Sequence, residues 1–497
     1  MRAGVALSGG GHRASVFALG VLLYLVRCGR NANVAHITSV SGGSITNAYV
    51  GLSGDYRNFS ADEFDQIAGA LALQLSDRGS IYSHWLTRAC MAAALALLLL
   101  AAFAAYLIGP HASALLWSMP LLVFLASVLA ARGWLFEKAL DAQFLSCNGK
   151  AARCSDLKGR PPFHVITAAE AQSGEPTHFG WVYDDAATTG PHFRPSVLCA
   201  SFSPVNEDQP LSRAVRASAA YPGAFPPVRL PGSAIDDFAF NVGYERWTPT
   251  LPTHLALVDG GVIDNMGLDW FLNWGGAGAS PLIVVSSSAN RIPRTPFKSR
   301  RWFATLTSLI RSSAIPYHLR ERNQRRALLQ RFRASYAGSA TPDLSGAIIH
   351  IGDSPYDLAF AIVHSESTVA GGALVLTDED LQIYQSLSES ASWATDIKAR
   401  AAAVISELDR ADNDTDGRRV LTAWRLRARK NSGVPTRLKA LGRTTTIELM
   451  RHGFAMAMAR LHIVLNYPLH PIPSAADFEN ILKESASRSS PGSPSKV

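Results

Sequence analysis

The chain has 497 residues, of which 47% are hydrophobic and only 17% are charged. Soluble domains typically have about 25% charged residues, so this composition argues against a wholly soluble protein and indicates a membrane part. The net charge of +8 is concentrated in Lys298–Arg333, which alone carries +9, so the rest of the chain is close to neutral. The basic character therefore needs a local explanation. Nucleic acid is not expected as a partner.

The N-terminus predicts a buried strand, Arg2–Leu7, and not a signal peptide. Gly9, Gly10 and Gly11 follow this strand and precede a predicted helix, Val16–Val26. Their amides can face an anion without obstruction by side chains. A dinucleotide site is one interpretation, but it needs an acid about twenty residues later, and no acid precedes position 55. An oxyanion hole is the second interpretation, and a plain glycine turn is the third.

Ser41 stands between a predicted strand, Val34–Val40, and a predicted helix, Ser44–Leu52. Small residues lie two positions to either side, Ser39 and Gly43, as in a nucleophile elbow, although Ser39 stands where the usual pattern has glycine. Such a turn exposes the hydroxyl, and the start of the following helix favours developing negative charge. Taken alone, the pattern also fits an ordinary turn. Another helix is predicted over Ala61–Leu75.

The segment Ala89–Ala131 contains no Asp, Glu, Lys or Arg. A Gly-Pro turn at position 109 divides it into two apolar stretches of twenty residues, Ala89–Ile108 and Ala112–Ala131, each long enough as a helix to span about 30 Å. We therefore predict a transmembrane helical hairpin; the alternative is a buried hairpin in a soluble protein. Trp85 and Trp134 flank it as interfacial residues do.

Basic residues lie at both outer ends of the hairpin, at Arg88, Arg132 and Lys138, whereas the turn carries only His111. The positive-inside rule therefore places both ends, and the domain attached to them, on the cytoplasmic side. The five cysteines are odd in number and have no metal-ligand spacing, which also favours a reducing compartment.

Strands predicted after the hairpin alternate with helices, which is typical of a mostly parallel α/β sheet covered on both faces. Asp259 ends one of these strands and enters a Gly-Gly turn. An acid at the carboxyl end of a strand is well placed for a site, although helix capping is the alternative and suits Asp264 or Asn265 better. We expect the three motifs to converge at one edge of the sheet. The predicted strands are Phe163–Thr167, Leu255–Val258, Leu282–Ser286 and Ala347–Ile351.

These motifs, in this order, resemble those of patatin-like phospholipases. The resemblance covers roughly Gly4–Ala289 outside the hairpin. The glycine loop continues with His12 and Arg13, as Ser8–Arg13. Ala217–Val228 is similar to the family's Ala-Ser and Phe-Pro-Pro box. Ile166–Glu170, together with Ser173–Pro176, is similar to another of the family's segments.

The resemblance implies a three-layer patatin-like fold and a Ser-Asp dyad without histidine, with Ser41 as nucleophile and Asp259 as base. It implies that Gly9, Gly10 and Gly11 form the oxyanion hole, helped by Arg13. Members of the family hydrolyse ester bonds of phospholipids or neutral lipids without a catalytic metal, so we expect no cofactor, a membrane lipid as substrate and the bilayer as partner.

Several alternatives stay open. A Ser-His-Asp triad could use His164, His254 or His318, although none stands in a motif. The same acyl-enzyme could serve an acyltransferase, and a non-catalytic membrane scaffold would retain the fold without the chemistry. The basic segment either attracts anionic headgroups or forms a solvated helix face. An acidic run from Asp412 resembles a calcium loop but lacks its final Glu, so it predicts an ordinary turn.

The C-terminal part predicts helices over Thr377–Leu408, opened by a Thr377 cap, and over Thr444–Leu465, followed by a disordered Ser/Pro-rich tail. The predicted organisation has five parts. They are residues 1–85, first part of the catalytic domain; 86–134, the hairpin; 135–376, second part of the catalytic domain with the basic segment 298–333; 377–482, a helical region; and 483–497, the tail.

Overall fold

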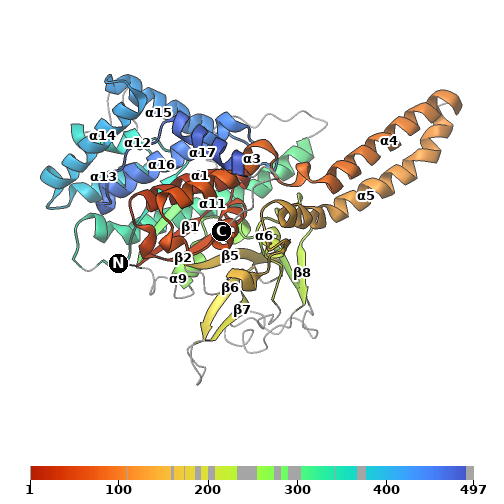
Figure 1. The fold of residues 1–497 in the computed structure, drawn as a ribbon, viewed down its shortest axis with the longest axis horizontal. Helices are drawn as coiled ribbons and strands as arrows, with labels where there is room; N and C mark the ends of the chain where they lie inside the picture. Colours follow the sequence, from red (N-terminus) through yellow and green to blue (C-terminus); the bar gives the residue numbers. More distant parts are fainter. Residues whose placement is uncertain are drawn as a thin grey trace.

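The computed structural model describes most of the chain. The described residues are 2–108, 110–157, 162–172, 174–184, 192–199, 208–231, 254–273, 281–288, 304–340, 342–365 and 376–488. In this part the fold is mixed α/β, with a mostly parallel central sheet and helices on its faces, as the sequence predicts (Figure 1). The predicted tail lies mainly outside the described residues.

The main sheet has the strand order β11-β10-β1-β2-β5-β6-β7, with β9 also paired to β5 and β8 paired to β9. The strands from β11 to β5 are parallel, whereas β6, β7, β8 and β9 pair antiparallel. The bounds are β1 Ala3–Leu7, β2 Val34–Val40, β5 Phe163–Glu170, β6 Pro176–Asp184, β7 His192–Cys199, β8 Val228–Pro231, β9 His254–Asp259, β10 Leu282–Ser287 and β11 Ser345–His350, with a separate pair β3 Ser146–Cys147 and β4 Lys150–Ala151.

The central strands are apolar runs because both faces of the sheet are covered. Every residue of β1, β10 and β11 is buried. One cover is α1, Gly11–Arg27, which packs against the sheet and against α16, Arg443–Leu465. A side chain at Gly20 would overlap the carbonyl of Met450, so these two helices approach to backbone contact. Further helices here are α2 Gly42–Ser53, α3 Ala61–Asp77, α6 Leu211–Ser218, α8 Gly261–Asp264 and α9 Asp269–Asn273.

The C-terminal helices gather on one side of the sheet, around α16 (Figure 1). The Thr377 hydroxyl accepts a hydrogen bond from the Asp380 amide, which confirms the predicted helix start. The region predicted to be helical over Thr377–Leu408 is divided by a turn at residues 389–392, after which a π-helical turn, Trp393–Ile397, leads directly into the next helix. The bounds are α12 Pro355–His364, α13 Asp378–Ser388, α14 Lys398–Asp412, α15 Gly417–Ser432 and α17 Ala475–Arg488.

Two long helices, α4 (Trp85–Ile108) and α5 (Pro110–Gln143), lie side by side and project away from the body (Figure 1). Within the described part of the chain, the helix Trp85–Leu107 is long and apolar enough to cross a membrane, and its most apolar stretch of 18 residues has no buried residue. The helix α5 does not end at Trp134: it continues into the body, where Leu135 and Phe136 are buried.

The described part of the basic segment forms α11, Ala304–Tyr336. Most of its arginines face acids on neighbouring segments at 2.6–3.7 Å, so they are held by the protein itself, and Arg325 also lies 3.9 Å from Glu321 on the same helix. This favours the solvated or packed helix face over a headgroup-binding surface. The pairs join Arg322 and Arg326 to Asp378, Arg325 to Glu321 and Glu379, Arg331 to Asp343, and Arg333 to Glu389.

Candidate active site

Ser41 is the single residue between β2 and α2, and its backbone is forced into an uncommon conformation. Its φ is 51° and its ψ is −118°. A non-glycine residue with positive φ is strained unless its surroundings hold it there, and such strain is frequent at functional sites. The strand-to-helix turn thus has the geometry of a nucleophile elbow, with Ser41 at its tip.

The residues after Ser41 must be glycines because the backbone of the first loop lies against them. A side chain at Gly42 would overlap the carbonyl of Gly11, and a Cβ at Gly43 would lie 2.5 Å from the carbonyl oxygen of Leu7. The position of Ser39 differs, since its hydroxyl is buried and donates to the carbonyl of Val165 at 3.2 Å. A small polar residue therefore fits there without disturbing the turn.

Ser218, at the end of α6, holds the elbow in place. Its hydroxyl accepts a hydrogen bond from the Ser41 amide at 2.8 Å and donates to the carbonyl of Thr167 at 2.6 Å. It also lies 2.9 Å from the Ser44 hydroxyl. Sequence reasoning placed Ser218 only within a family box and missed this role, because nothing local to residue 218 points to residue 41.

We expect Ser218→Ala to destabilise the protein by about 1–3 kcal/mol, because the Ser41 amide would be buried without an acceptor. The rate of reaction of Ser41 with an electrophilic probe should fall as the strained turn relaxes. Ser212→Ala on the same helix is the matched control, since the Ser212 hydroxyl has no hydrogen-bond partner among the described residues. Thermal melting and probe kinetics measure both effects; equal behaviour of the two variants would contradict the role.

Asp259 meets the elbow through the arrangement of strands around β5. The register pairs Val40 with Thr167 and Asp259 with Ala168, the next residue along β5. Along one of its two edges, β5 pairs with β6. Both β2 and β9 therefore pair with the other edge of β5, where the two strands meet end to end. Asp259 ends a strand, as the sequence predicts, and this strand, β9, runs antiparallel to β5.

The carboxyl group of Asp259 is buried, with 4% of the residue exposed. Burial raises its pKa to about 7, while hydrogen bonds from the Gly261 amide and the Ser41 hydroxyl act in the opposite direction. The Gly261 amide donates to Oδ1 at 2.8 Å. Both acids considered for helix capping accept backbone amides: Asp259 from Gly261, the first residue of α8, and Asp264 from Met266 and from Asp269, the first residue of α9.

The three glycines of the first loop have different roles in the structure. The Gly9 amide donates to the carbonyl of Asn265 at 3.0 Å, and a side chain at Gly9 would overlap Oδ1 of Asn265. Gly10 and Gly11 have φ of 139° and 64°, which favours glycine. Helix α1 begins at Gly11 and α2 at Gly42, so the amides of these residues belong to first turns and lack acceptors within their helices.

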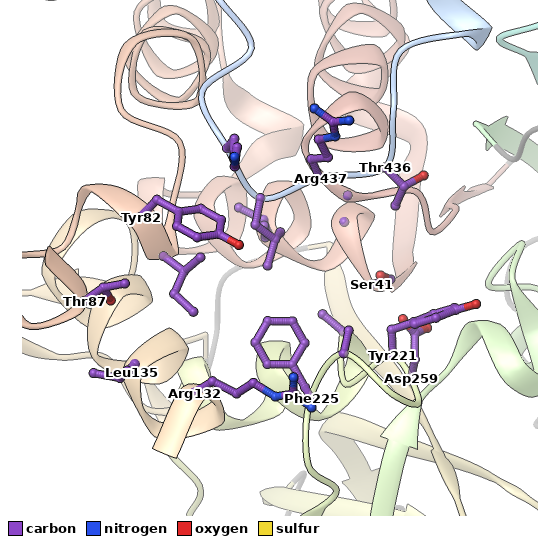
Figure 2. A pocket seen from close by; sticks show the side chains of 18 of the residues that line it. Ser41, Tyr82, Thr87, Arg132, Leu135, Tyr221, Phe225, Asp259, Thr436 and Arg437 are labelled. Carbon is purple, nitrogen blue, oxygen red and sulfur yellow. The ribbon is translucent and has the colours of Figure 1, made fainter. Parts of the chain in front are cut away.

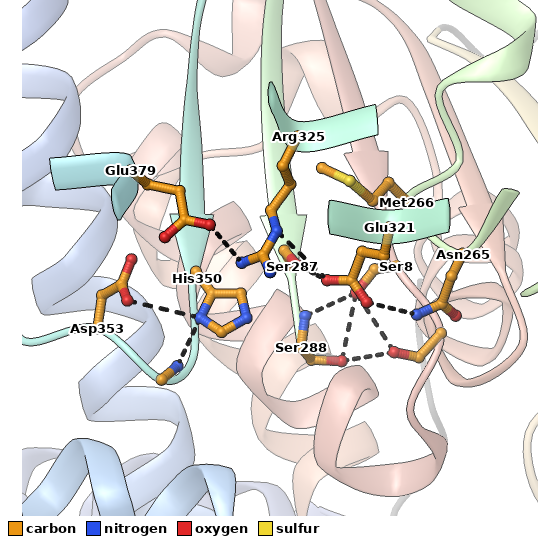
Figure 3. A network of polar contacts seen from close by, with 12 residues as sticks. Ser8, Asn265, Met266, Ser287, Ser288, Glu321, Arg325, His350, Asp353 and Glu379 are labelled. Atoms are coloured by element: carbon orange, nitrogen blue, oxygen red, sulfur yellow. Dashed lines mark hydrogen bonds and ion pairs between the residues drawn. The ribbon is translucent and has the colours of Figure 1, made fainter. Parts of the chain in front are cut away.

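A polar network of residues after β10 and on α11 holds the glycine loop in place (Figure 3). The Ser288 hydroxyl donates to the carbonyl of Gly9 at 2.6 Å, and the Ser288 amide donates to the Ser8 hydroxyl at 2.7 Å. Glu321 of α11 accepts from Asn265 at 3.3 Å and from the Ser287 hydroxyl at 3.1 Å. The loop after Asp259, the glycine loop and α11 are therefore tied together.

Arg13 and His12 both form hydrogen bonds to backbone carbonyls in the C-terminal part of the chain. The guanidinium of Arg13 donates to the carbonyls of Ser432, Val434 and Ser288 at 2.6–3.0 Å. Nδ1 of His12 lies 2.9 Å from the carbonyl of Lys439, so Nδ1 is the donor. Burial lowers the pKa of His12 to about 4, which keeps the ring neutral. Both residues therefore hold the backbone of the loop between α15 and α16 against the start of α1.

A family model described as patatin-like phospholipase matches residues 5–272, which is more than half of the chain. This chain belongs to the patatin-like phospholipase family. A search among curated proteins finds no significant match.

Two solved structures are also similar to this patatin-like phospholipase. The crystal structure of VipD from Legionella pneumophila is 13% identical, with a TM-score of 0.28, and the match covers 100% of this chain and 94% of that chain. Human GIVD cytosolic phospholipase A2 is 11% identical, with a TM-score of 0.32, over 81% of this chain and 59% of that one.

A cavity of about 830 Å³ opens beside Ser41 and Asp259, which lie at the same end of it (Figure 2). Four of its lining residues, Thr436–Lys439, come from the loop between α15 and α16, far beyond the part that the patatin-like family model matches. The sequence carries no motif there that could have pointed to the site. No histidine is among the described lining residues, so nothing in the described cavity supports a triad based on His164, His254 or His318.

Proposed function

We propose that this patatin-like phospholipase is a membrane-anchored lipid acyl hydrolase in which Ser41 is the nucleophile and Asp259 its base. One observation carries the proposal: the strained Ser41 turn and the buried Asp259 carboxyl meet end to end along β5, beside one cavity. A pKa of about 7 suits a base that must accept a proton near neutral pH.

In the proposed mechanism, ionised Asp259 accepts the hydroxyl proton of Ser41 as the oxygen attacks the ester carbonyl. The amides of Gly10, Gly11 and Gly42 stabilise the oxyanion, and the starts of α1 and α2 favour the same negative charge. Gly9 is left out because its amide already donates to Asn265. Arg13 acts indirectly by holding the loop. Protonated Asp259 gives this proton to the departing alcohol or lysolipid, and Asp259 then takes a proton from the water that attacks the acyl-enzyme and releases the fatty acid, returning that proton to Ser41.

Membrane anchoring is part of the proposal, and three features support it. The helix Trp85–Leu107 has the length and composition of a span, and its large apolar side chains, such as Leu99 and Phe103, are 60–62% exposed. Trp85 and Trp134 are exposed at the ends nearest the body, where interfacial aromatics are expected. The second predicted span, Ala112–Ala131, lies within α5.

The purified full-length protein, reconstituted in mixed phospholipid vesicles, should release free fatty acid from the bilayer lipids. Mass spectrometry of the lipid classes measures the release and names the preferred lipid. The reconstituted protein should also remain in the membrane fraction after alkaline carbonate washing. Vesicles whose lipids stay unchanged under all compositions tested would speak for the scaffold instead of the hydrolase.

A further inference from the structure

We propose that the bases of α4 and α5 form the acyl-chain wall of the active site, so that a lipid chain enters from the bilayer along the hairpin. This inference rests on the proposed function and gives the hairpin a second task besides anchoring. The occupant is the long acyl chain of a membrane lipid whose ester carbonyl lies at Ser41.

The cavity itself supplies the first argument. Beginning at Ser41 and Asp259, it is bounded at its other end by residues of the hairpin, as Figure 2 shows for Thr87 and Leu135. Cys90, Met91, Val128 and Leu129 also line it, and all four belong to α4 or α5. The volume is in the range of roughly 300–1,000 Å³ that small-molecule sites occupy. One continuous space thus joins the reactive serine to the helices that carry the exposed apolar surface.

The second argument is that the wall is continuous with the surface proposed to lie in lipid. Met91 and Leu129 line the cavity and are also 55–57% exposed, so they belong to both surfaces. Farther along the same helices, Leu95 and Val123 are 58–60% exposed without lining the cavity. An acyl chain can therefore pass from the bilayer to the cavity without contact with water. Each CH₂ group exposed to water would lower the affinity about fourfold.

The third argument is that the wall is rigidly attached to the elbow. Glu137 of α5 accepts from Arg216 of α6 at 2.7 Å, and Phe136 stacks on Phe225 with ring centroids 5.3 Å apart. Helix α6 ends at Ser218, whose hydroxyl holds the Ser41 amide. The hairpin base and the serine are thus connected through one short helix, which fixes the chain-binding wall relative to the reacting atom.

A two-stage labelling experiment on the full-length protein in vesicles tests this arrangement. A fluorophosphonate with a sixteen-carbon chain and a terminal diazirine first labels Ser41, and light then crosslinks the chain end to its neighbours. We expect crosslinked peptides from α4 and α5. Crosslinks confined to the C-terminal helices or to β6–β8 would overturn the inference while leaving the proposed function intact. Absence of any Ser41 label would overturn both.

A matched pair of variants gives an independent measurement. Val128→Trp should fill the part of the cavity beside α5. The turnover of a sixteen-carbon p-nitrophenyl ester, divided by that of the four-carbon ester, should then fall at least tenfold. Val123→Trp makes the same change on the same helix outside the cavity and should keep the ratio within twofold. Equal ratios in both variants would contradict the inference. If Val128→Trp does not fold, the crosslinking of the unmodified protein decides alone.

Discussion

Replacing Ser41 by alanine should abolish labelling by a fluorophosphonate probe and lower the turnover of lipid esters by roughly 10⁶-fold, as expected when a catalytic nucleophile is removed. The fold should persist, because the change removes one hydroxyl from a turn whose backbone is held by Ser218. Alanine at a φ of 51° is strained much as serine is, so the melting temperature should change little.

The control for this variant is Ser53→Ala, at the other end of α2, where the hydroxyl donates to the carbonyl of Tyr49. Ser53→Ala should keep full labelling and turnover. In-gel detection of the probe and fatty acid release measure both variants in the same vesicles. Undiminished labelling of Ser41→Ala would place the nucleophile on another residue and end the proposed mechanism.

Replacing Asp259 by asparagine should lower kcat/KM by about 10⁴-fold or more, because the amide cannot accept the Ser41 proton. In the wild type, kcat/KM should rise about tenfold per pH unit below pH 7 and level off above it, since only ionised Asp259 is a base and its pKa is about 7. The residual activity of Asp259→Asn should lack this step. A wild-type profile that is flat between pH 5 and 9 would contradict Asp259 as the base.

The same variant should become more stable than the wild type at alkaline pH. Folding raises the pKa of Asp259 from 3.8 to about 7, so the fold binds this proton more tightly than the unfolded chain does. The associated stability is present below pH about 4 and is lost as pH rises through about 7, at a cost on the order of 4 kcal/mol. Asparagine avoids this loss. Thermal melts at pH 5 and pH 8 should show a larger gain of Asp259→Asn over the wild type at the higher pH, because the wild type has lost only part of this stability at pH 5.

The sequence determined the features that depend on neighbouring residues. Short runs rich in Val, Ile and Thr predicted the mostly buried strands Val34–Val40 and Leu282–Ser287, and the helix predicted over Thr444–Leu465 is confirmed by α16, Arg443–Leu465. The glycine-rich turn and the serine between a strand and a helix were visible because turn chemistry is local. The length of the uncharged stretch likewise predicted α4 without knowledge of its surroundings.

Only the tertiary structure decided how these pieces meet. The antiparallel entry of β9 brings Asp259 end to end with β2, and Asn265 occupies the Gly9 amide that the sequence assigned to the oxyanion. Arg13 turns to the carbonyls of Ser432 and Val434, and the loop after them lines the cavity. Strand direction and contacts across four hundred residues depend on packing and register, which no local pattern in the sequence encodes.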